Sequence, residues 1–553
     1  MATSASKKEP TRPIPVPYDD NEGNLRAFAP LSPKANGTRA RIALPPAKVM
    51  PVIVIAGIMG SNLRVKTTDG VSENELKPGE SAWAPPNGLS EGLDEAKKWK
   101  NRSPAVRQRI LNGESLEVDP SGLIYLGMPS TNFVWDEKVA RERGWGEIHA
   151  SSYGTLLIRL QQNLNTTFRS VWGNPMLEDS WHHLNLRGRE KWGIGADHSL
   201  AEKLTIDEMK KFAEYHYPVY AFGYNWLKSN ESASNELRTR IEKIIAYWKN
   251  KKRECSAVIL VTHSMGGLVA RACAKQIPEK VVGIIHGVMP ALGAPACYRR
   301  LACGTESNNP SNGWIGNISA GKFAEIAGET NAETTPVLST AAGPLELLPN
   351  HLYPKPWLFV ETKTNLKNED LISLPKGNPY DFYRDFRSWY RIIDPALADP
   401  AHQFSGKVDV KITKALDQAQ KFHMDVLNDY YHPNTFAFYG NDKEQLSFGS
   451  CRWKSKSYPS GSSERELESA RHDIYLPDGG RRVKLKSGLT VDFVPGEQDA
   501  PGDGTVPPKS GAGPDGKIRY LFRTAGYSHQ GSYADEDMLA LTQHLIVRLM
   551  QKI

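Results

Sequence analysis

The chain has 553 residues, of which 39% are hydrophobic and 24% are charged, and it carries a formal net charge of +7 at pH 7. This is the composition of an ordinary globular protein, and the length predicts one large domain with insertions, or a core with a cap. The positive charge is spread along the chain without aromatic-interleaved basic elements, so we expect no nucleic-acid partner.

Five cysteines, odd in number and without C-x-x-C spacing, argue against a disulfide framework or a zinc site. Residues 1–48 are rich in proline and small polar residues, which predicts a disordered or loosely attached N-terminal arm. This arm lacks the apolar segment of a Sec signal peptide, and no run of ~18 apolar residues predicts a membrane span. We therefore expect synthesis in the cytoplasm and, for any action outside the cell, a separate export machine.

The first strong pattern is the apolar run at residues 51–56, which predicts a strand buried on both faces of a parallel sheet. A glycine-flanked turn at 57–61 follows, at the sheet edge where α/β proteins bind ligands. In a hydrolase this turn would supply an oxyanion-hole amide. Residues 62–144 then lose periodicity and gain aromatic residues, which predicts either a lid-like insertion over an apolar site or a structural excursion.

Strand and helix patterns alternate in the next part of the chain. Apolar runs predict strands at 218–226, 258–263 and 281–288, and apolar residues at helical spacing predict helices near 153–164 and 237–248. This βαβ alternation predicts an α/β class fold with a mostly parallel, doubly wound sheet. We expect residues 49–295 to form the first part of the core.

The remaining sequence divides into a cap and a second part of the core. Residues 296–433 break the alternation, and we expect a mainly helical cap insertion there. Residues 434–553 resume it with a strand at 435–440 and a final helix from Met538 to about Leu549. Between these two elements, the polar stretch at about 441–490 is expected to be a loop or hairpin excursion.

The run from Val258 to Val269 has the pattern of a strand, a sharp turn and a helix, with Ser264 at the apex, as in a nucleophile elbow. Thr262 replaces the first glycine of the G-x-S-x-G motif, so a plain structural turn remains an alternative. We expect position 262 to require only a small side chain. His263 is expected to point away from the serine hydroxyl and to have a structural role.

Two late segments supply partners for this serine. Asp503 lies in the glycine-flanked turn at 502–507, and His529 lies in a loop before the final helix. Taken alone, Asp503 is equally typical of an ordinary turn aspartate, and His529 is only one of 14 histidines in the chain. Their order after Ser264 is nevertheless that of the α/β-hydrolase triad, so we predict Ser264 as nucleophile, Asp503 as acid and His529 as base.

These motifs resemble the lipase branch that contains lecithin:cholesterol acyltransferase, phospholipid:diacylglycerol acyltransferase and the PGAP-type GPI inositol deacylases. The resemblance rests on residues 57–61, 223–226, 263–267, 292–295, 502–507 and 528–529, with departures at Ala56, Asn225 and Thr262. It implies an α/β-hydrolase fold with large, mainly helical cap insertions. It also implies an oxyanion hole formed by the backbone amides of Met59 and Met265, with Ile58 as the alternative to Met59. This chemistry needs no cofactor or metal, and no D-x-D-x-D-G loop signals a structural Ca²⁺.

The chain also resembles the antibacterial phospholipase effectors of the bacterial type VI secretion apparatus. That resemblance implies A-type hydrolysis of membrane glycerophospholipids, export with a type VI spike component to the periplasm or membrane surface of a target cell, and a cognate immunity protein. An acyltransferase or GPI-inositol deacylase with the same triad is an alternative. A non-catalytic lipid- or protein-binding module with a relic triad is another.

Overall fold

The computed structural model describes residues 46–67, 75–84, 89–126, 136–171, 174–195, 198–311, 314–364, 367–455 and 463–553, and short pieces between residues 12 and 42. Most of the predicted N-terminal arm at 1–48 lies outside the described residues. Its described pieces are paired two by two or form a single turn: β1 (Arg12–Ile14) with β4 (Ala40–Ile42), β2 (Tyr18–Asp19) with β3 (Leu25–Arg26), and the 3-10 helix Lys34–Asn36.

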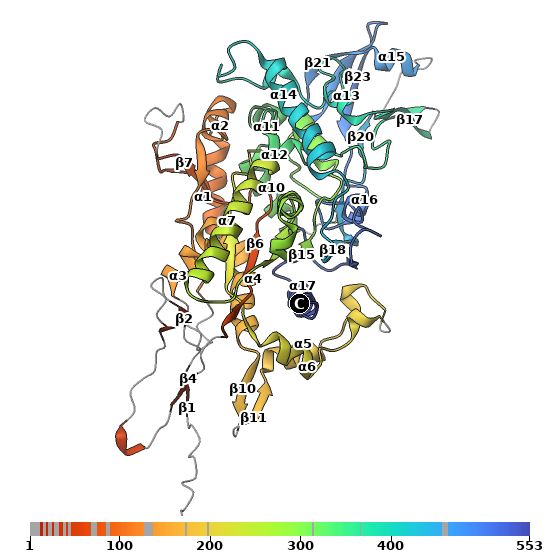
Figure 1. The fold of residues 1–553 in the computed structure, drawn as a ribbon. Coiled ribbons are helices and arrows are strands. Elements are labelled where there is room, and N and C mark those ends of the chain that lie inside the picture. The colour runs from red at the N-terminus through yellow and green to blue at the C-terminus, as the bar shows by residue number, and fades with distance from the viewer. Residues whose placement is uncertain are drawn as a thin grey trace, which may run out of the picture.

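A six-stranded sheet forms the centre of the molecule, and every neighbouring pair of its strands is parallel (Figure 1). In spatial order the strands are β13 (Val219–Phe222), β6 (Val52–Ile55), β14 (Val258–His263), β15 (Val281–Gly287), β18 (Thr435–Gly440) and β25 (Tyr520–Thr524). Every residue of the first three strands is buried, which explains their continuous apolar sequences. The predicted parallel sheet is confirmed.

Two layers of helices cover the two faces of this sheet. Alternate residues of β6 point to opposite faces, so that Ile53 and Ile55 join one hydrophobic core while Val52 and Val54 join the other. The first core is closed by α7 (Asn230–Asn250) and α8 (Gly266–Gln276), and the second by α4 (Ala150–Asn165) and α17 (Glu536–Met550). Among the described residues, no helix is long and apolar enough to cross a membrane.

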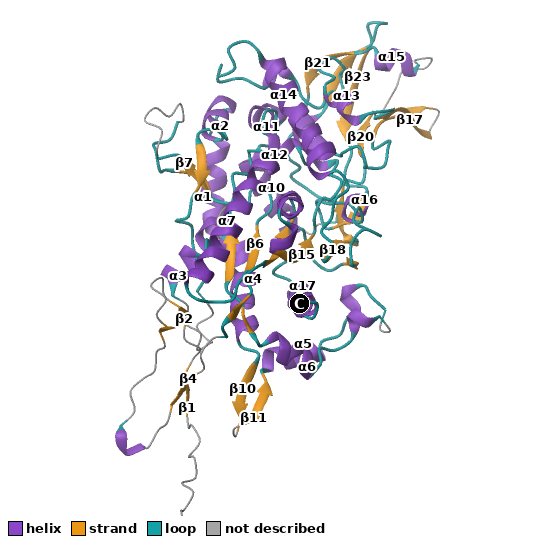
Figure 2. Cartoon of the chain, in the orientation of Figure 1, coloured by secondary structure: helices purple, strands orange, loops and turns teal. Residues whose placement is uncertain are grey.

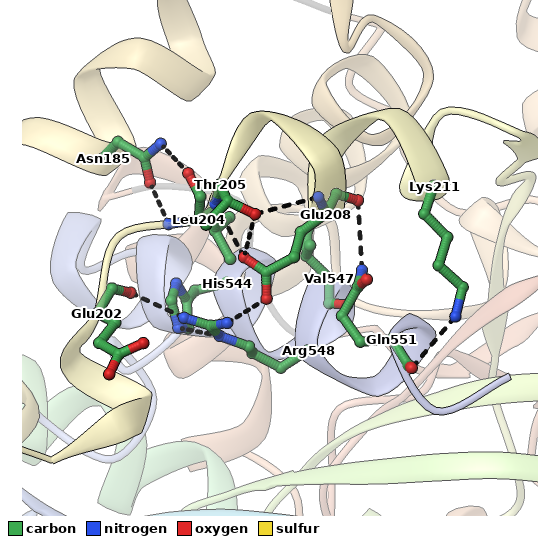
Figure 3. Close-up of polar contacts among 10 residues, drawn as sticks. All are labelled: Asn185, Glu202, Leu204, Thr205, Glu208, Lys211, His544, Val547, Arg548 and Gln551. Atoms are coloured by element: carbon green, nitrogen blue, oxygen red, sulfur yellow. Dashed lines mark hydrogen bonds and ion pairs between the residues drawn. The ribbon is translucent and has the colours of Figure 1, made fainter.

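A segment that no sequence pattern predicted wraps around the C-terminal helix. It consists of β10 (Phe168–Val171), β11 (Asn174–Leu177), α5 (Asp179–Leu186), two 3-10 helices (Glu190–Trp192 and Ser199–Ala201), α6 (Ile206–Phe212) and β12 (Tyr215–His216), the last paired with β5 (Lys48–Val49). Figure 3 shows its contacts with α17: Arg548 pairs with Glu208 and donates to the carbonyl of Glu202 at 2.9 Å, and Lys211 donates to the carbonyl of Gln551 at 3.2 Å. These contacts hold the end of the chain against the core.

The described part of the lid-like insertion at 62–144 is ordered structure around an aromatic core. It contains a three-stranded antiparallel sheet and three helices: β8 (Ser81–Trp83), β7 (Leu63–Val65) and β9 (Leu116–Val118), then α1 (Leu89–Lys100), α2 (Pro104–Ile110) and α3 (Glu137–Glu142). Trp83 packs edge-on against Trp99 and Trp226, with ring centroids 5.9 and 5.3 Å apart. All three rings are buried, so these aromatic residues form a core and do not line an open apolar site.

A second six-stranded sheet joins the mainly helical cap at 296–433 to the polar excursion at about 441–490, and no sequence pattern predicted that the two segments share a sheet. Its strands come from both segments, in the order β17 (Lys367–Leu374), β16 (Leu358–Thr364), β20 (Cys451–Lys454), β23 (Thr490–Pro495), β22 (Arg481–Lys484) and β21 (Arg471–Tyr475). Figure 2 shows the labelled strands of this sheet gathered at one end of the molecule. Exposed and buried residues alternate along β23, so its mean hydropathy is low and no continuous apolar run marks it as a strand. The excursion at about 441–490 therefore packs with the cap, whereas β18 at 435–440 belongs to the central sheet.

Helices complete this cap region. They are α9 (Ala296–Cys303), α10 (Trp314–Ala327), α11 (Asn331–Leu338), α12 (Ala342–Leu345), α13 (Pro379–Tyr383), α14 (Val408–Lys421) and α15 (Glu464–Glu468). The antiparallel pair β19 (Asp442–Ser447) and β24 (Ala500–Gly502) leads the chain out to the second sheet and back, and α16 (Pro508–Gly511) follows. The chain thus returns to the end of β18 before it reaches Asp503.

Candidate active site

Ser264 lies in a sharp turn between β14 and α8, at the carboxyl edge of the central sheet. Its φ angle is 52°, in the left-handed region that non-glycine residues rarely adopt. The close packing of the turn explains the second glycine of the motif, since a Cβ atom on Gly266 would lie 2.4 Å from the backbone carbonyl oxygen of Ala56. The backbone therefore has the strained geometry of a nucleophile elbow although the motif lacks its first glycine.

Asp503 lies beside the end of β18, about 60 positions later in the sequence than that strand. A Cβ atom on Gly440, the last residue of β18, would lie 2.7 Å from the Cβ of Asp503. One carboxylate oxygen accepts hydrogen bonds from the backbone amides of Thr505 at 2.9 Å and Val506 at 2.7 Å. The Gly-Asp-Gly-Thr-Val-Pro turn therefore holds the carboxylate in one orientation and leaves its second oxygen for another partner.

His529 joins the other two predicted residues. Its Nδ1 lies 2.8 Å from the free carboxylate oxygen of Asp503, and its Nε2 lies 2.9 Å from the Oγ of Ser264. Because the carboxylate only accepts, this network assigns the proton to Nδ1 and leaves Nε2 to accept the serine proton. The structure thus brings the three predicted residues, from the turns after β14 and β24 and the loop after β25, into one hydrogen-bonded chain that can activate a serine.

The turn after β6, predicted to supply one oxyanion-hole amide, packs directly against the serine. A Cβ atom on Gly57 would lie 2.9 Å from the Cβ of Ser264. Met59 has a φ angle of 61°, and its carbonyl accepts a 2.8 Å hydrogen bond from the indole of Trp83. No described residue accepts a hydrogen bond from the amide of Met59 or of Met265. The roles of these amides in an oxyanion hole stay a prediction, and no sequence pattern indicated the contact of Trp83 with this turn.

Thr262 corrects the expectation that its position requires only a small side chain. Its hydroxyl lies 2.8 Å from Nδ1 of His286 on the neighbouring strand β15, and both side chains are buried. Burial lowers the pKa of His286 to about 3, so the imidazole is neutral in the folded protein. Thr262 therefore makes a specific polar contact across the sheet, directly below the elbow.

Replacing Thr262 with valine is expected to lower the free energy of unfolding by about 1–3 kcal/mol, because it leaves a buried imidazole nitrogen without its partner. Serine at this position keeps the hydroxyl and is the matched control. Unfolding in urea measures both variants. Equal stability of the valine variant and the native protein would show that the Thr262–His286 contact contributes nothing.

The described residues contain neither a metal-binding cluster nor a disulfide. No group of three or more histidine, cysteine, aspartate or glutamate side chains among them is arranged to hold a metal ion. All five cysteines are free, and burial raises the pKa of each thiol. Such thiols are poor nucleophiles at neutral pH, which leaves Ser264 as the candidate nucleophile.

The candidate nucleophile is covered in this structure. Ser264 is 4% exposed and Asp503 is 1% exposed. A cavity of about 570 Å³ lies between the insertion after β6 and the cap, but its lining includes none of the three triad residues. This cavity is therefore separate from the triad.

Comparisons with known proteins agree with this fold. A model described as the PGAP1-like alpha/beta domain matches residues 219–303, which run from β13 through the elbow to α9. Over 147 residues, 26% of the chain, the sequence is 36% identical to the uncharacterized protein YJR098C of Saccharomyces cerevisiae, and the match spans 21% of that protein's length.

A solved structure described as the crystal structure of the Tle4-Tli4 complex extends the similarity to almost the whole chain. The two chains are 27% identical, the match covers 91% of this chain and 98% of the other, and the TM-score is 0.72. The predicted α/β-hydrolase fold and the predicted resemblance to PGAP-type lipases and type VI effectors are confirmed.

Proposed function

We propose that this α/β hydrolase is a lipolytic serine esterase that cleaves acyl esters of membrane glycerophospholipids, as a phospholipase of the A type. The observation that carries the proposal is the hydrogen-bonded chain from Asp503 through His529 to the Oγ of Ser264, with distances of 2.8 and 2.9 Å. The serine end of this hydrogen-bonded chain lies beside the turn that contains Met59, a residue with a positive φ angle whose carbonyl accepts a hydrogen bond from Trp83. Nucleophile, base, acid and a neighbouring set of amides are the parts that acyl transfer requires.

In the proposed reaction, Ser264 attacks the ester carbonyl while Nε2 of His529 takes its proton. The same nitrogen then protonates the departing glycerol oxygen, and Asp503 keeps the imidazole in the correct tautomer and stabilises its charged form. Water, activated by His529, hydrolyses the acyl-enzyme and releases the fatty acid. The amides of Met59 and Met265 would stabilise the tetrahedral oxyanion, and losing one such donor typically costs about 3 kcal/mol of transition-state stabilisation.

The proposed biological role is that of an antibacterial effector delivered by a type VI apparatus to the periplasm or membrane surface of a target cell. The similarity to Tle4 over 91% of the chain supports this role. Because that structure contains Tle4 bound to Tli4, it also supports a cognate immunity protein as a partner of this chain. A mild positive charge of +7 favours approach to an anionic membrane surface.

Hydrolysis of phospholipid vesicles tests the proposed activity. Purified protein added to vesicles of phosphatidylethanolamine and phosphatidylglycerol is expected to release free fatty acid and lysophospholipid, both measured by mass spectrometry. Transfer of the acyl group to an added acceptor alcohol, with no free fatty acid, would favour the acyltransferase alternative. Vesicle binding without any product would favour the non-catalytic alternative.

A further inference from the structure

His263, next to the candidate nucleophile, takes part in a second hydrogen-bonded chain that the proposed mechanism does not use. The backbone amide of Gly57 donates to the hydroxyl of Tyr153 at 2.9 Å, and that hydroxyl lies 2.9 Å from Nδ1 of His263. Nε2 of His263 lies 3.0 Å from the backbone carbonyl of His529. The chain therefore runs from the predicted oxyanion turn to the backbone of the catalytic base.

We propose that Tyr153 and His263 are positioning residues that keep the oxyanion turn and the His529 loop at fixed positions relative to each other and to Ser264. The inference rests on the proposed function, since it assigns these residues a part in the same reaction. Neither residue touches the Oγ of Ser264 through any hydrogen bond that the described residues form, so neither is a catalytic residue.

The direction of each hydrogen bond in this chain follows from its donors. The tyrosine oxygen accepts from Gly57, and its single proton is left for Nδ1 of His263. An imidazole that accepts at Nδ1 carries its proton at Nε2, and it therefore donates to the carbonyl of His529. Each donor in this hydrogen-bonded chain has one acceptor, so the position of the Gly57 turn depends on the position of the His529 backbone.

Burial of Tyr153 and His263 maintains these hydrogen-bond directions. Tyr153 is 1% exposed and His263 is 2% exposed. Burial, together with the nearby imidazole of His529, lowers the pKa of His263 to about 3, so Nδ1 remains an acceptor throughout the neutral range. In such surroundings a lost hydrogen bond is not replaced by water.

The contacts at the two ends of the chain show why it matters for the site. His529 is held at both of its backbone groups, because its amide donates to the carbonyl of Asp503 at 2.6 Å and its carbonyl accepts from His263. At the other end, a Cβ atom on Gly57 would lie 2.9 Å from both Nδ1 of His263 and the Cβ of Ser264. A shift of His263 therefore moves the base, the oxyanion turn, or both, relative to the serine.

The first test replaces Tyr153 with phenylalanine and uses Tyr533→Phe as a matched control. Tyr533 is equally buried and its ring packs against the same imidazole, but its hydroxyl donates to the carbonyl of Thr262. With a soluble short-chain ester, Tyr153→Phe is expected to lower kcat about 10- to 100-fold with KM unchanged, because small displacements of reacting groups have effects of this size. The Tyr533 variant should keep the native kcat.

The second test compares two amides at position 263. Glutamine places its donor near the position of Nε2 and keeps the contact with the His529 carbonyl, whereas asparagine is too short to reach it. Both variants should therefore lose kcat, because His263→Gln lacks the acceptor for Tyr153 and His263→Asn lacks the donor to the His529 carbonyl. Equal kcat in both variants and in the native protein, or an equal loss in the Tyr533 control, would overturn the inference.

A readout that needs no turnover separates this inference from the proposed function. Amide hydrogen exchange in residues 526–531 is expected to be faster in His263→Asn than in His263→Gln. If the native protein hydrolysed no ester, the proposed function would fail, and this comparison would still decide whether His263 positions the loop. Identical exchange in the two variants would mean that it does not.

Discussion

Replacing Ser264 with alanine is expected to lower the turnover of phospholipid vesicles by at least ~10⁴-fold, because no other described group can form the acyl-enzyme in its place. The fold should be retained, since alanine at a φ angle of 52° carries the same backbone strain as serine. The measurement is fatty-acid release under saturating substrate, with thermal unfolding of the same sample to confirm an intact fold.

Ser532 provides the matched control for this substitution. It lies three residues after His529, is also buried, and its hydroxyl has no hydrogen-bond partner among the described residues. Ser532→Ala should therefore keep native turnover. Native turnover in Ser264→Ala would remove Ser264 as nucleophile and, with it, the proposed mechanism.

Replacing Asp503 with asparagine is expected to lower kcat about 10³- to 10⁴-fold, the scale that this change has in other Ser-His-Asp enzymes. The asparagine oxygen can still accept from the amides of Thr505 and Val506, so the turn should survive. Its NH₂ group would then face Nδ1 of His529 and force the imidazole proton onto Nε2. In that tautomer His529 cannot accept the proton of Ser264.

Steady-state kinetics on the soluble ester measure the effect of Asp503→Asn without any membrane-binding step. A loss in kcat with little change in KM is expected, because the substitution changes proton transfer and leaves substrate contacts intact. A KM effect alone would show that Asp503 contributes to binding and that another group orients the imidazole.

Strands of the central sheet such as Val52–Ile55 and Val258–His263 were predictable because they are buried on both faces and are therefore continuous apolar runs. The second sheet was not, because strands such as Thr490–Pro495 expose every other side chain and have a polar average. The segment at 168–216, which wraps around the C-terminal helix, could not be predicted either. Its position depends on contacts such as Arg548 with Glu208, which are 340 residues apart.

The three triad candidates could be predicted because each lies in a short motif and their order along the chain is informative. The residues that hold the site could not, because their roles depend on contacts between distant segments. Trp83 contacts Met59 from the insertion, and Tyr153 contacts His263 from a helix 110 positions earlier. Thr262 contacts His286 only because β14 and β15 pair in parallel with these two residues side by side.

Covalent labelling with a fluorophosphonate tests most directly whether Ser264 is a nucleophile activated by His529 and Asp503. The native protein is expected to form one adduct, located by peptide mass spectrometry on Ser264. The adduct should be absent in Ser264→Ala and should form far more slowly in Asp503→Asn. An adduct on a different residue, or no adduct in a native sample that hydrolyses esters, would contradict the account.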